Sequence, residues 1–136
     1  MKTLVLFGMG LVAVVAPAWA HHSAAAEYDF KVLQTYTGTI TKVEWLNPHA
    51  RFFMDVKDAD GKMSNWEFQT GSPNQLLRQG WTRNSLKLGY VVTVTAYRAK
   101  DGDTLGDAQT ITLSDGRRLL SGSGDGAPPV KEAPAK

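Results

Sequence analysis

The sequence predicts an all-β domain, a small OB-like barrel of five to six strands with one short helix between strands three and four. Three observations predict it. Segments rich in alternating or β-branched residues recur along residues 35–120, and turns that contain glycine separate them. A Ser-Pro pair, typical of a helix start, falls between the third and fourth segments. An open six-stranded sheet or a small sandwich is the alternative that the strand count leaves open.

Residues 1–20 have the pattern of a cleaved signal peptide. Lys2 gives a positive start, residues 4–15 are apolar, and Pro17 ends any helix before Ala18 and Ala20, the small residues of an A-x-A cleavage site. The apolar run is slightly short for a membrane span, and no stop-transfer charge cluster follows it. We therefore predict cleavage after Ala20, a periplasmic location and no integral membrane protein after cleavage.

The charge and the cysteine content restrict the function classes. Removal of residues 1–20 lowers the formal net charge from +2 to +1, because Lys2 is the only charged residue among them. A chain so close to neutral has no electrostatic attraction to nucleic acid or to an anionic membrane. The chain has no cysteine, so the exported domain depends on its core alone and offers no thiol chemistry.

Residues 21–34 are predicted to be a lead-in to the barrel. Ser23 can cap one helical turn over the alanines that follow it, but so short a helix is marginal in water. The lead-in is therefore expected to pack Tyr28 and Phe30 at the domain edge.

The first strand is predicted over residues 35–45, which are rich in threonine and β-branched residues. Gly38 lies inside this strand, where a glycine commonly marks a bulge or a sharp bend. Ile40 and Val43 are three positions apart, which breaks strict alternation and again predicts a bulge.

A hairpin is predicted next. Residues 50–57 alternate between apolar and polar side chains, an Asp-Gly turn ends at Gly61, and residues 63–69 form the third strand. The core residues expected from this register and from the fourth strand are Phe52, Met54, Trp66, Phe68, Val92 and Val94.

A short helix and two further strands complete the barrel. Ser72 is expected to cap the helix, and Gly80 to end it. Strands follow at residues 91–98 and 107–113, and Leu119 and Leu120 form a last short apolar pair. Residues 121–136 are predicted to be a disordered tail, because they have nothing to bury. The domain is thus expected over residues 35–120.

Three motifs stand out: HHS at residues 21–23, GTITKVEW and NPH within residues 38–49, and GWTR and SLK within residues 80–87. Together they resemble an uncharacterised family of small exported bacterial proteins. The resemblance covers His21 to about Leu120. It implies export and a single β domain, and it implies no activity. The sequence departs from the pattern at Leu88, where proline is expected before the glycine; this concerns a turn and not chemistry.

The three histidines are His21, His22 and His49. Cleavage after Ala20 makes His21 the amino terminus, and its α-amine, with a pKa of about 8, and its imidazole can chelate one metal ion once deprotonated. His49 then adds a third nitrogen, in an arrangement that resembles the histidine brace of copper proteins. Nitrogen donors favour Cu(II) among first-row divalent ions. His22 offers a competing mode through amine, backbone amide and imidazole.

The alternative for the histidines is structural: two solvated residues, and a turn in which His49 caps a carbonyl. Geometry also speaks against the metal site if the first strand is straight. Its length of about 11 residues at about 3.3 Å each would place the Asn-Pro-His loop far from the strand start. A lead-in of about 13 residues spans that distance only if it is nearly extended, or if the strand curls as barrel strands do.

A second candidate surface combines aromatic and basic residues, with which OB barrels bind oligonucleotides and sugars. Export argues against nucleic acid and leaves glycans or peptides. Trp81, Arg83 and Asn47 are the candidates for this ligand face. Packing behind the helix cap is the simpler explanation for Trp81.

The sequence lacks a G-x-S-x-G elbow and a phosphate-binding glycine loop, and its strand carboxylates lie on alternating faces. We therefore predict that the protein is not an enzyme. The leading hypothesis is an exported binding protein that holds a transition metal, copper first, through His21 and His49. The alternative is a metal-free interaction module that binds a peptide, a glycan or a partner protein.

Overall fold

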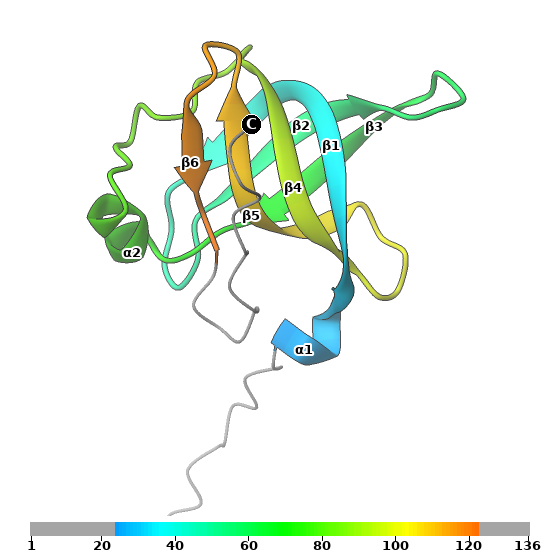
Figure 1. Ribbon diagram of the computed structural model, residues 1–136, viewed down its shortest axis with the longest axis horizontal. Helices are drawn as coiled ribbons and strands as arrows, with labels where there is room; N and C mark the ends of the chain where they lie inside the picture. Colours follow the sequence, from blue (N-terminus) through cyan, green and yellow to red (C-terminus); the bar gives the residue numbers. More distant parts are fainter. Residues whose placement is uncertain (1–23, 123–136) are drawn as a thin grey trace, which may run out of the picture.

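Five strands close into a ring in the order β1–β2–β3–β5–β4 and back to β1 (Figure 1). The computed structural model describes residues 24–122. Its elements in chain order are α1 (Ala24–Glu27), β1 (Tyr28–Glu44), β2 (Arg51–Lys57), β3 (Met63–Gln69), α2 (Pro73–Arg78), β4 (Val91–Ala99), β5 (Leu105–Leu113) and β6 (Arg118–Leu120). Paired strands are antiparallel except β3 and β5, whose parallel pairing closes the ring. The predicted OB-like barrel is confirmed, and the ring excludes an open sheet.

β1 is long because it has two partners. Its first part pairs with β4 and its last part with β2, and Gly38 lies opposite a residue of each. The predicted bulge is present between Ile40 and Lys42. The strand rises from α1 and arches over the barrel before it leads into β2 (Figure 1). It is therefore curled, as strands of small barrels are.

The core fills the inside of the ring. All the core residues expected from the sequence are buried: Phe52, Met54, Trp66, Phe68, Val92 and Val94. Phe52 and Phe68 face each other across β2 and β3, with their ring centroids 5.3 Å apart. The alternation read from residues 50–69 therefore predicts the correct register.

α2 begins and ends where the sequence predicts. The Ser72 hydroxyl accepts a hydrogen bond from the backbone N–H of Gln75, and Pro73 occupies the first turn. Gly80 follows the helix with a φ of +90°, a conformation that favours glycine. Leu76 is fully buried in the core, so the helix plugs this end of the barrel.

The lead-in differs from the prediction, because β1 begins at Tyr28 rather than at residue 35. α1 precedes it as the single helical turn. Tyr28 pairs with Ala99, and the next paired residue, Leu33, pairs with Tyr97, so the register is interrupted between them. Only β4 pairs with this part of β1, and the pairing is irregular. Buried and exposed residues therefore do not alternate regularly over residues 28–34, and the sequence pattern does not indicate a strand there.

A second apolar cluster lies on the outside of the barrel. This outer cluster consists of Ala24, Tyr28 and Tyr97, with Phe30 and Leu105 packed against it. It anchors the start of the described chain to β4 and β5. The expected packing of Tyr28 and Phe30 at the domain edge is therefore confirmed.

Ser121, the first residue of the predicted disordered tail, is buried instead. Its hydroxyl donates to the carbonyl of Ala108, and its N–H donates to the carbonyl of Gln109. The rest of the predicted tail, the signal peptide, His21 and His22 lie outside the described residues. Within residues 24–122, no helix is long and apolar enough to cross a membrane.

Candidate functional site

Three strands bring a row of polar residues together on the outer face of the barrel. Arg51 on β2 lies opposite Gln69 on β3, and Gln69 lies opposite Asp107 on β5. Residues opposite each other share a face of the sheet, and the core contains the neighbours Ala50, Phe52, Phe68 and Ala108. With strands about 4.8 Å apart, the backbones of Arg51 and Asp107 are about 10 Å apart. We call Arg51, Gln69 and Asp107 the outer row.

His49, two residues before Arg51, lies on the same outer face as the outer row. The pairing of β2 and β3 extends past their ends, because Thr70 N–H donates to Ala50 O and Ala50 N–H donates to Gly71 O. Ala50 points into the core, so alternation directs its neighbours His49 and Arg51 outward. His49 therefore lies beside the outer row.

A hydrogen bond sets the tautomer of His49. Its Nδ1 lies 3.1 Å from the carbonyl oxygen of Thr70. A carbonyl oxygen only accepts, so Nδ1 carries the proton, and in the neutral ring the Nε2 atom carries the lone pair. This is the carbonyl-capping role that the sequence allowed. It is also the arrangement found in many metal-ligating histidines.

Asp107 is a fully buried carboxylate, with 0% of its surface exposed. Its Oδ2 accepts a hydrogen bond of 2.8 Å from Nε2 of Gln109, which is also buried. Burying a carboxylate is costly unless it is well paired, and such groups cluster at functional sites. Asp107 is therefore the most informative polar group of this face.

Tyr28 covers the same face from the start of the chain. Only 1% of its surface is exposed, and its hydroxyl has no hydrogen-bond partner within residues 24–122. Burial raises the pKa of Tyr28 well above its ordinary value, and the nearby carboxylates Glu27, Asp107 and Glu67 raise it further, while Arg51 opposes them. The charges of Asp107 and Arg51, the two end residues of the outer row, thus both affect the pKa of Tyr28.

Arg51 is held by two carboxylates. Its Nη1 lies 2.8 Å from Oε1 of Glu67, and its Nε lies 3.6 Å from Oε2 of Glu44. The hydrogen bond from Lys42, together with the charges of Lys42 and Arg51, holds the pKa of Glu44 below its usual range. These pairs are half exposed, so they orient Arg51 more than they stabilise the fold.

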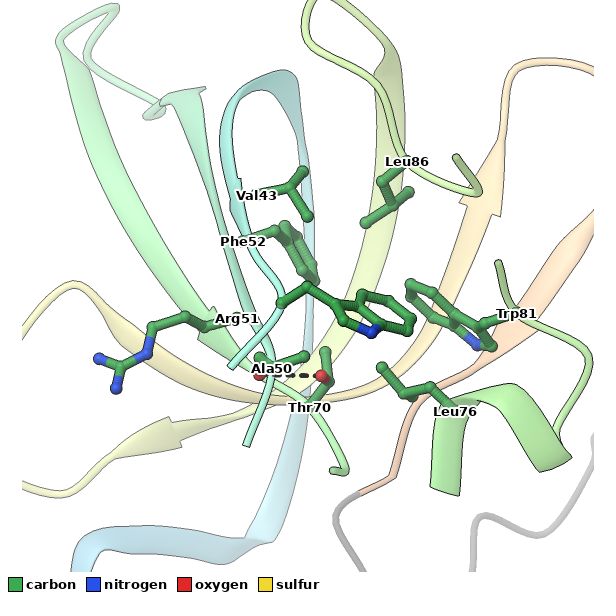
Figure 2. Close-up of a pocket in the computed structure, with 9 residues that line it drawn as sticks. Val43, Ala50, Arg51, Phe52, Thr70, Leu76, Trp81 and Leu86 are labelled. Carbon is green, nitrogen blue, oxygen red and sulfur yellow. Dashed lines mark hydrogen bonds between the residues drawn. The ribbon is translucent and has the colours of Figure 1, made fainter. Parts of the chain in front are cut away.

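A small apolar hollow lies between the inner sides of β1 and β2 and the helix α2 (Figure 2). The residues that line it are Val43, Trp45, Ala50, Arg51, Phe52, Thr70, Leu76, Trp81 and Leu86. The end of the Arg51 side chain points away from the hollow (Figure 2). The cavity volume of about 10 Å³ is close to what one water molecule needs. The hollow therefore has no room for an organic ligand.

The predicted ligand face needs a correction at Trp81. Only 4% of its surface is exposed, and its Nε1 donates a hydrogen bond of 2.7 Å to the carbonyl of Leu120. Its ring packs near that of Trp45 and is not available to a ligand. Arg83 and Asn47 are exposed, and Asn47 precedes the cis-proline Pro48.

Of the predicted metal ligands, His49 is described, and His21 and His22 lie before the first described residue. Within residues 24–122 no group of three or more histidine, cysteine or acidic residues could hold a metal ion. Asp107, Gln109 and Tyr28 were not predicted as site residues. The only sequence signal for Asp107 is an acidic residue in an otherwise uncharged strand.

One family model matches this chain, over residues 9–108, and its description is "Family of unknown function (DUF6152)". No curated protein and no solved structure matches the chain.

Proposed function

The chain belongs to DUF6152, a family of unknown function, and from the residues of its outer face we propose that it is an exported, periplasmic protein that binds a transition metal ion. Copper is the first candidate. His21 and His49 are the proposed ligands, and His22 is the competing third ligand. The proposal is a binding function without catalysis. The hydrogen bond between His49 and Thr70 is the observation that carries it.

This hydrogen bond supports a ligand role for His49. Metal-ligating histidines commonly donate their second ring N–H to a backbone carbonyl, which fixes the ring and leaves the other nitrogen as the donor to the metal. The Nδ1 of His49 makes such a contact, 3.1 Å from the Thr70 oxygen. A histidine that only stabilises its loop makes the same bond, and the titrations described below separate the two roles.

The start of the described chain supports the participation of the amino terminus. Ala24 packs in the outer cluster with Tyr28 and Tyr97, and Tyr97 lies opposite Asp107 of the outer row. Two residues separate His21 from Ala24, so the three steps between them reach at most about 10 Å. The curl of β1 also supports the proposal, because the geometric objection applies to a straight strand. We therefore propose that the amine and the imidazole of His21 reach the outer face.

Calorimetric titration with Cu(II) tests the proposal. The processed protein that begins at His21 is expected to bind one copper ion. A matched protein with one glycine added before His21 is expected to bind far more weakly, because the extra residue destroys the amine–imidazole chelate ring and leaves the barrel intact. Equal affinity of the two proteins would refute the proposal.

The alternative is a metal-free interaction module for a peptide, glycan or partner protein. Three exposed leucines favour it: Leu46, Leu77 and Leu120. Trp81 lies three residues after the end of α2, its Nε1 donates to the Leu120 carbonyl, and its ring lies near that of Trp45, which precedes Leu46. With Arg83 and Asn47 exposed nearby in sequence, the three leucines would form an apolar surface with a polar rim. This function gains support if the processed protein binds no copper.

A further inference from the structure

We propose that one end of the barrel docks on the surface of a membrane that contains anionic lipids. This basic end consists of α2, residues 79–90, and β6 with the turn before it, which lie together on the left side of Figure 1. The tips of the β2–β3 and β4–β5 connections lie on the opposite side (Figure 1). The inference is independent of copper binding, and it concerns a contact at the membrane surface and not a membrane span.

The charge of the chain is unevenly distributed, although its net value is close to zero. Residues 68–100 contain no aspartate and no glutamate. Arg78, Arg83 and Lys87 in this stretch are exposed at the basic end, and so is Arg118 on β6. None of these four has an ion pair within the described part of the chain. Attraction to an anionic surface depends on such a local cluster and not on the net charge of the chain.

Acidic residues do not cancel this cluster. Asp115, in the turn before β6, is paired with Arg117, whose Nε lies 2.7 Å from its Oδ2. On the opposite side of the molecule, residues 57–62 and 100–103 carry four aspartates and three lysines. The positive charge is therefore concentrated at the basic end.

Each segment of the basic end also exposes a leucine. The exposed leucines are Leu77 on α2, Leu88 before β4 and Leu120 on β6, with 51%, 68% and 50% of their surface exposed. The leucines of the same segments that pack in or against the core are Leu76, Leu86 and Leu119. The exposed leucines therefore do not contribute to the core, and each has a basic residue at most two positions away. Exposed apolar side chains grouped with polar neighbours are typical of a binding surface.

Hydrogen bonds hold these segments together. Trp81 Nε1, just after α2, donates to the carbonyl of Leu120 over 2.7 Å. The N–H of Gly89 donates to the carbonyl of Ile40 over 2.8 Å, which fixes Leu88 beside β1. The basic end is thus a preformed surface, which lowers the entropy cost of binding.

The combination of side chains fits a lipid surface better than a nucleic acid. Proteins that bind single-stranded nucleic acid stack the bases on accessible aromatic rings, whereas the ring of Trp81 is buried. The exposed large apolar side chains of the basic end are mainly leucines. Leucines can enter the boundary between headgroups and acyl chains, while arginine and lysine contact the lipid phosphates.

Co-sedimentation with vesicles tests the inference, with the protein purified after export and a metal chelator present. The wild type is expected to bind vesicles of phosphatidylglycerol and phosphatidylcholine more tightly than vesicles of phosphatidylcholine alone. Arg78→Gln combined with Lys87→Gln is expected to weaken binding to the anionic vesicles about fivefold for each charge removed. Lys57→Gln combined with Lys62→Gln makes the same change of net charge on the opposite side, and this matched control is expected to bind like the wild type.

Leu77→Gln combined with Leu88→Gln tests the apolar contact, because it leaves the charge unchanged. Its affinity for the anionic vesicles is expected to fall severalfold, whereas Met63→Gln, at an exposed position of the β2–β3 hairpin, is expected to bind like the wild type. All the substituted side chains are exposed, so thermal unfolding followed by circular dichroism is expected to match the wild type.

Three results would overturn the inference. The first is a wild type that shows no preference for the anionic vesicles. The second is an equal loss of affinity in the Arg78/Lys87 variant and in the Lys57/Lys62 control. The third is wild-type affinity of the leucine variant, which would mean that the basic end binds an acidic polymer and not a lipid surface.

Discussion

A β-carbon added to Gly38 would lie 2.3 Å from the carbonyl oxygen of Asp55. β1 and β2 approach so closely here that only glycine fits. Gly38 also pairs with Val92 on β4, so the close approach occurs where β1 passes from one partner to the other. The glycine therefore allows the bend that brings both ends of β1 into the closed ring.

Gly38→Ala is expected to lower the free energy of unfolding by at least about 1–3 kcal/mol, the usual cost of forcing extra atoms into a packed site. Urea unfolding followed by tryptophan fluorescence measures it. Thr39→Ala, at the exposed neighbouring position, is the control and is expected to change stability by far less. Wild-type stability of Gly38→Ala would mean that β1 and β2 can separate here at no cost.

Phe52→Ala is expected to cost about 3–5 kcal/mol, because it removes a fully buried aromatic ring. Phe53→Ala removes the same number of atoms from the adjacent, half-buried outer position and is expected to cost less than half as much. Urea titrations of both variants give the comparison. A larger loss for Phe53 would place the register of β2 one residue off.

The hairpin of β2 and β3 is predictable from the sequence because one of its faces is buried and the other is not. Phe52, Met54, Trp66 and Phe68 alternate with polar or half-buried residues, so the period of two is visible locally. The cap at Ser72 is also local, since Ser-Pro carries its own backbone chemistry. These features need no knowledge of distant contacts.

The outer row is not predictable in this way. Asp107 meets Gln69 only through the parallel pairing of β3 and β5, which joins segments far apart in the chain. Its burial depends further on chain segments that cover the outside of the sheet, such as the one that contains Tyr28. A local pattern indicates which residues of one strand share a face. It does not indicate which residues of distant strands lie beside them. His49 could be proposed from residue type alone, but its bond to Thr70 could not.

The metal-free protein is expected to lose stability above pH 10 partly through Tyr28. The pKa of Tyr28 is raised in the folded state above the value of about 10 in the unfolded chain, so the unfolded state releases its proton first. The contribution of the protonated Tyr28 to the free energy of unfolding is therefore fully present below pH 10 and is lost as the pH rises further. Tyr28→Phe should therefore show a shallower loss than the wild type in urea titrations between pH 9 and 11. Tyr90→Phe, at an exposed tyrosine, is the control, and equal slopes for all three proteins would contradict the prediction.

Processing after Ala20 remains a prediction from the sequence, because Ala18 and Ala20 fit the cleavage site and Pro17 ends the apolar helix. Expression with export in a bacterium, followed by mass spectrometry of the purified protein, is expected to give an amino terminus at His21. A start at any other residue would remove the α-amine from the proposed chelate. The copper titrations should therefore follow this measurement.

His49→Ala decides which residue supplies the third copper ligand. If His49 is that ligand, its loss is expected to weaken binding at least about tenfold, which corresponds to about 1.4 kcal/mol. His22→Ala is the matched variant and should then bind almost like the wild type. Both the wild type and His22→Ala should bind more weakly as the pH falls from 8 to 6, because protons compete for the amine and the imidazoles. If His22→Ala loses affinity and His49→Ala does not, copper is held at the amino terminus alone, and the bond of His49 to Thr70 serves only the loop.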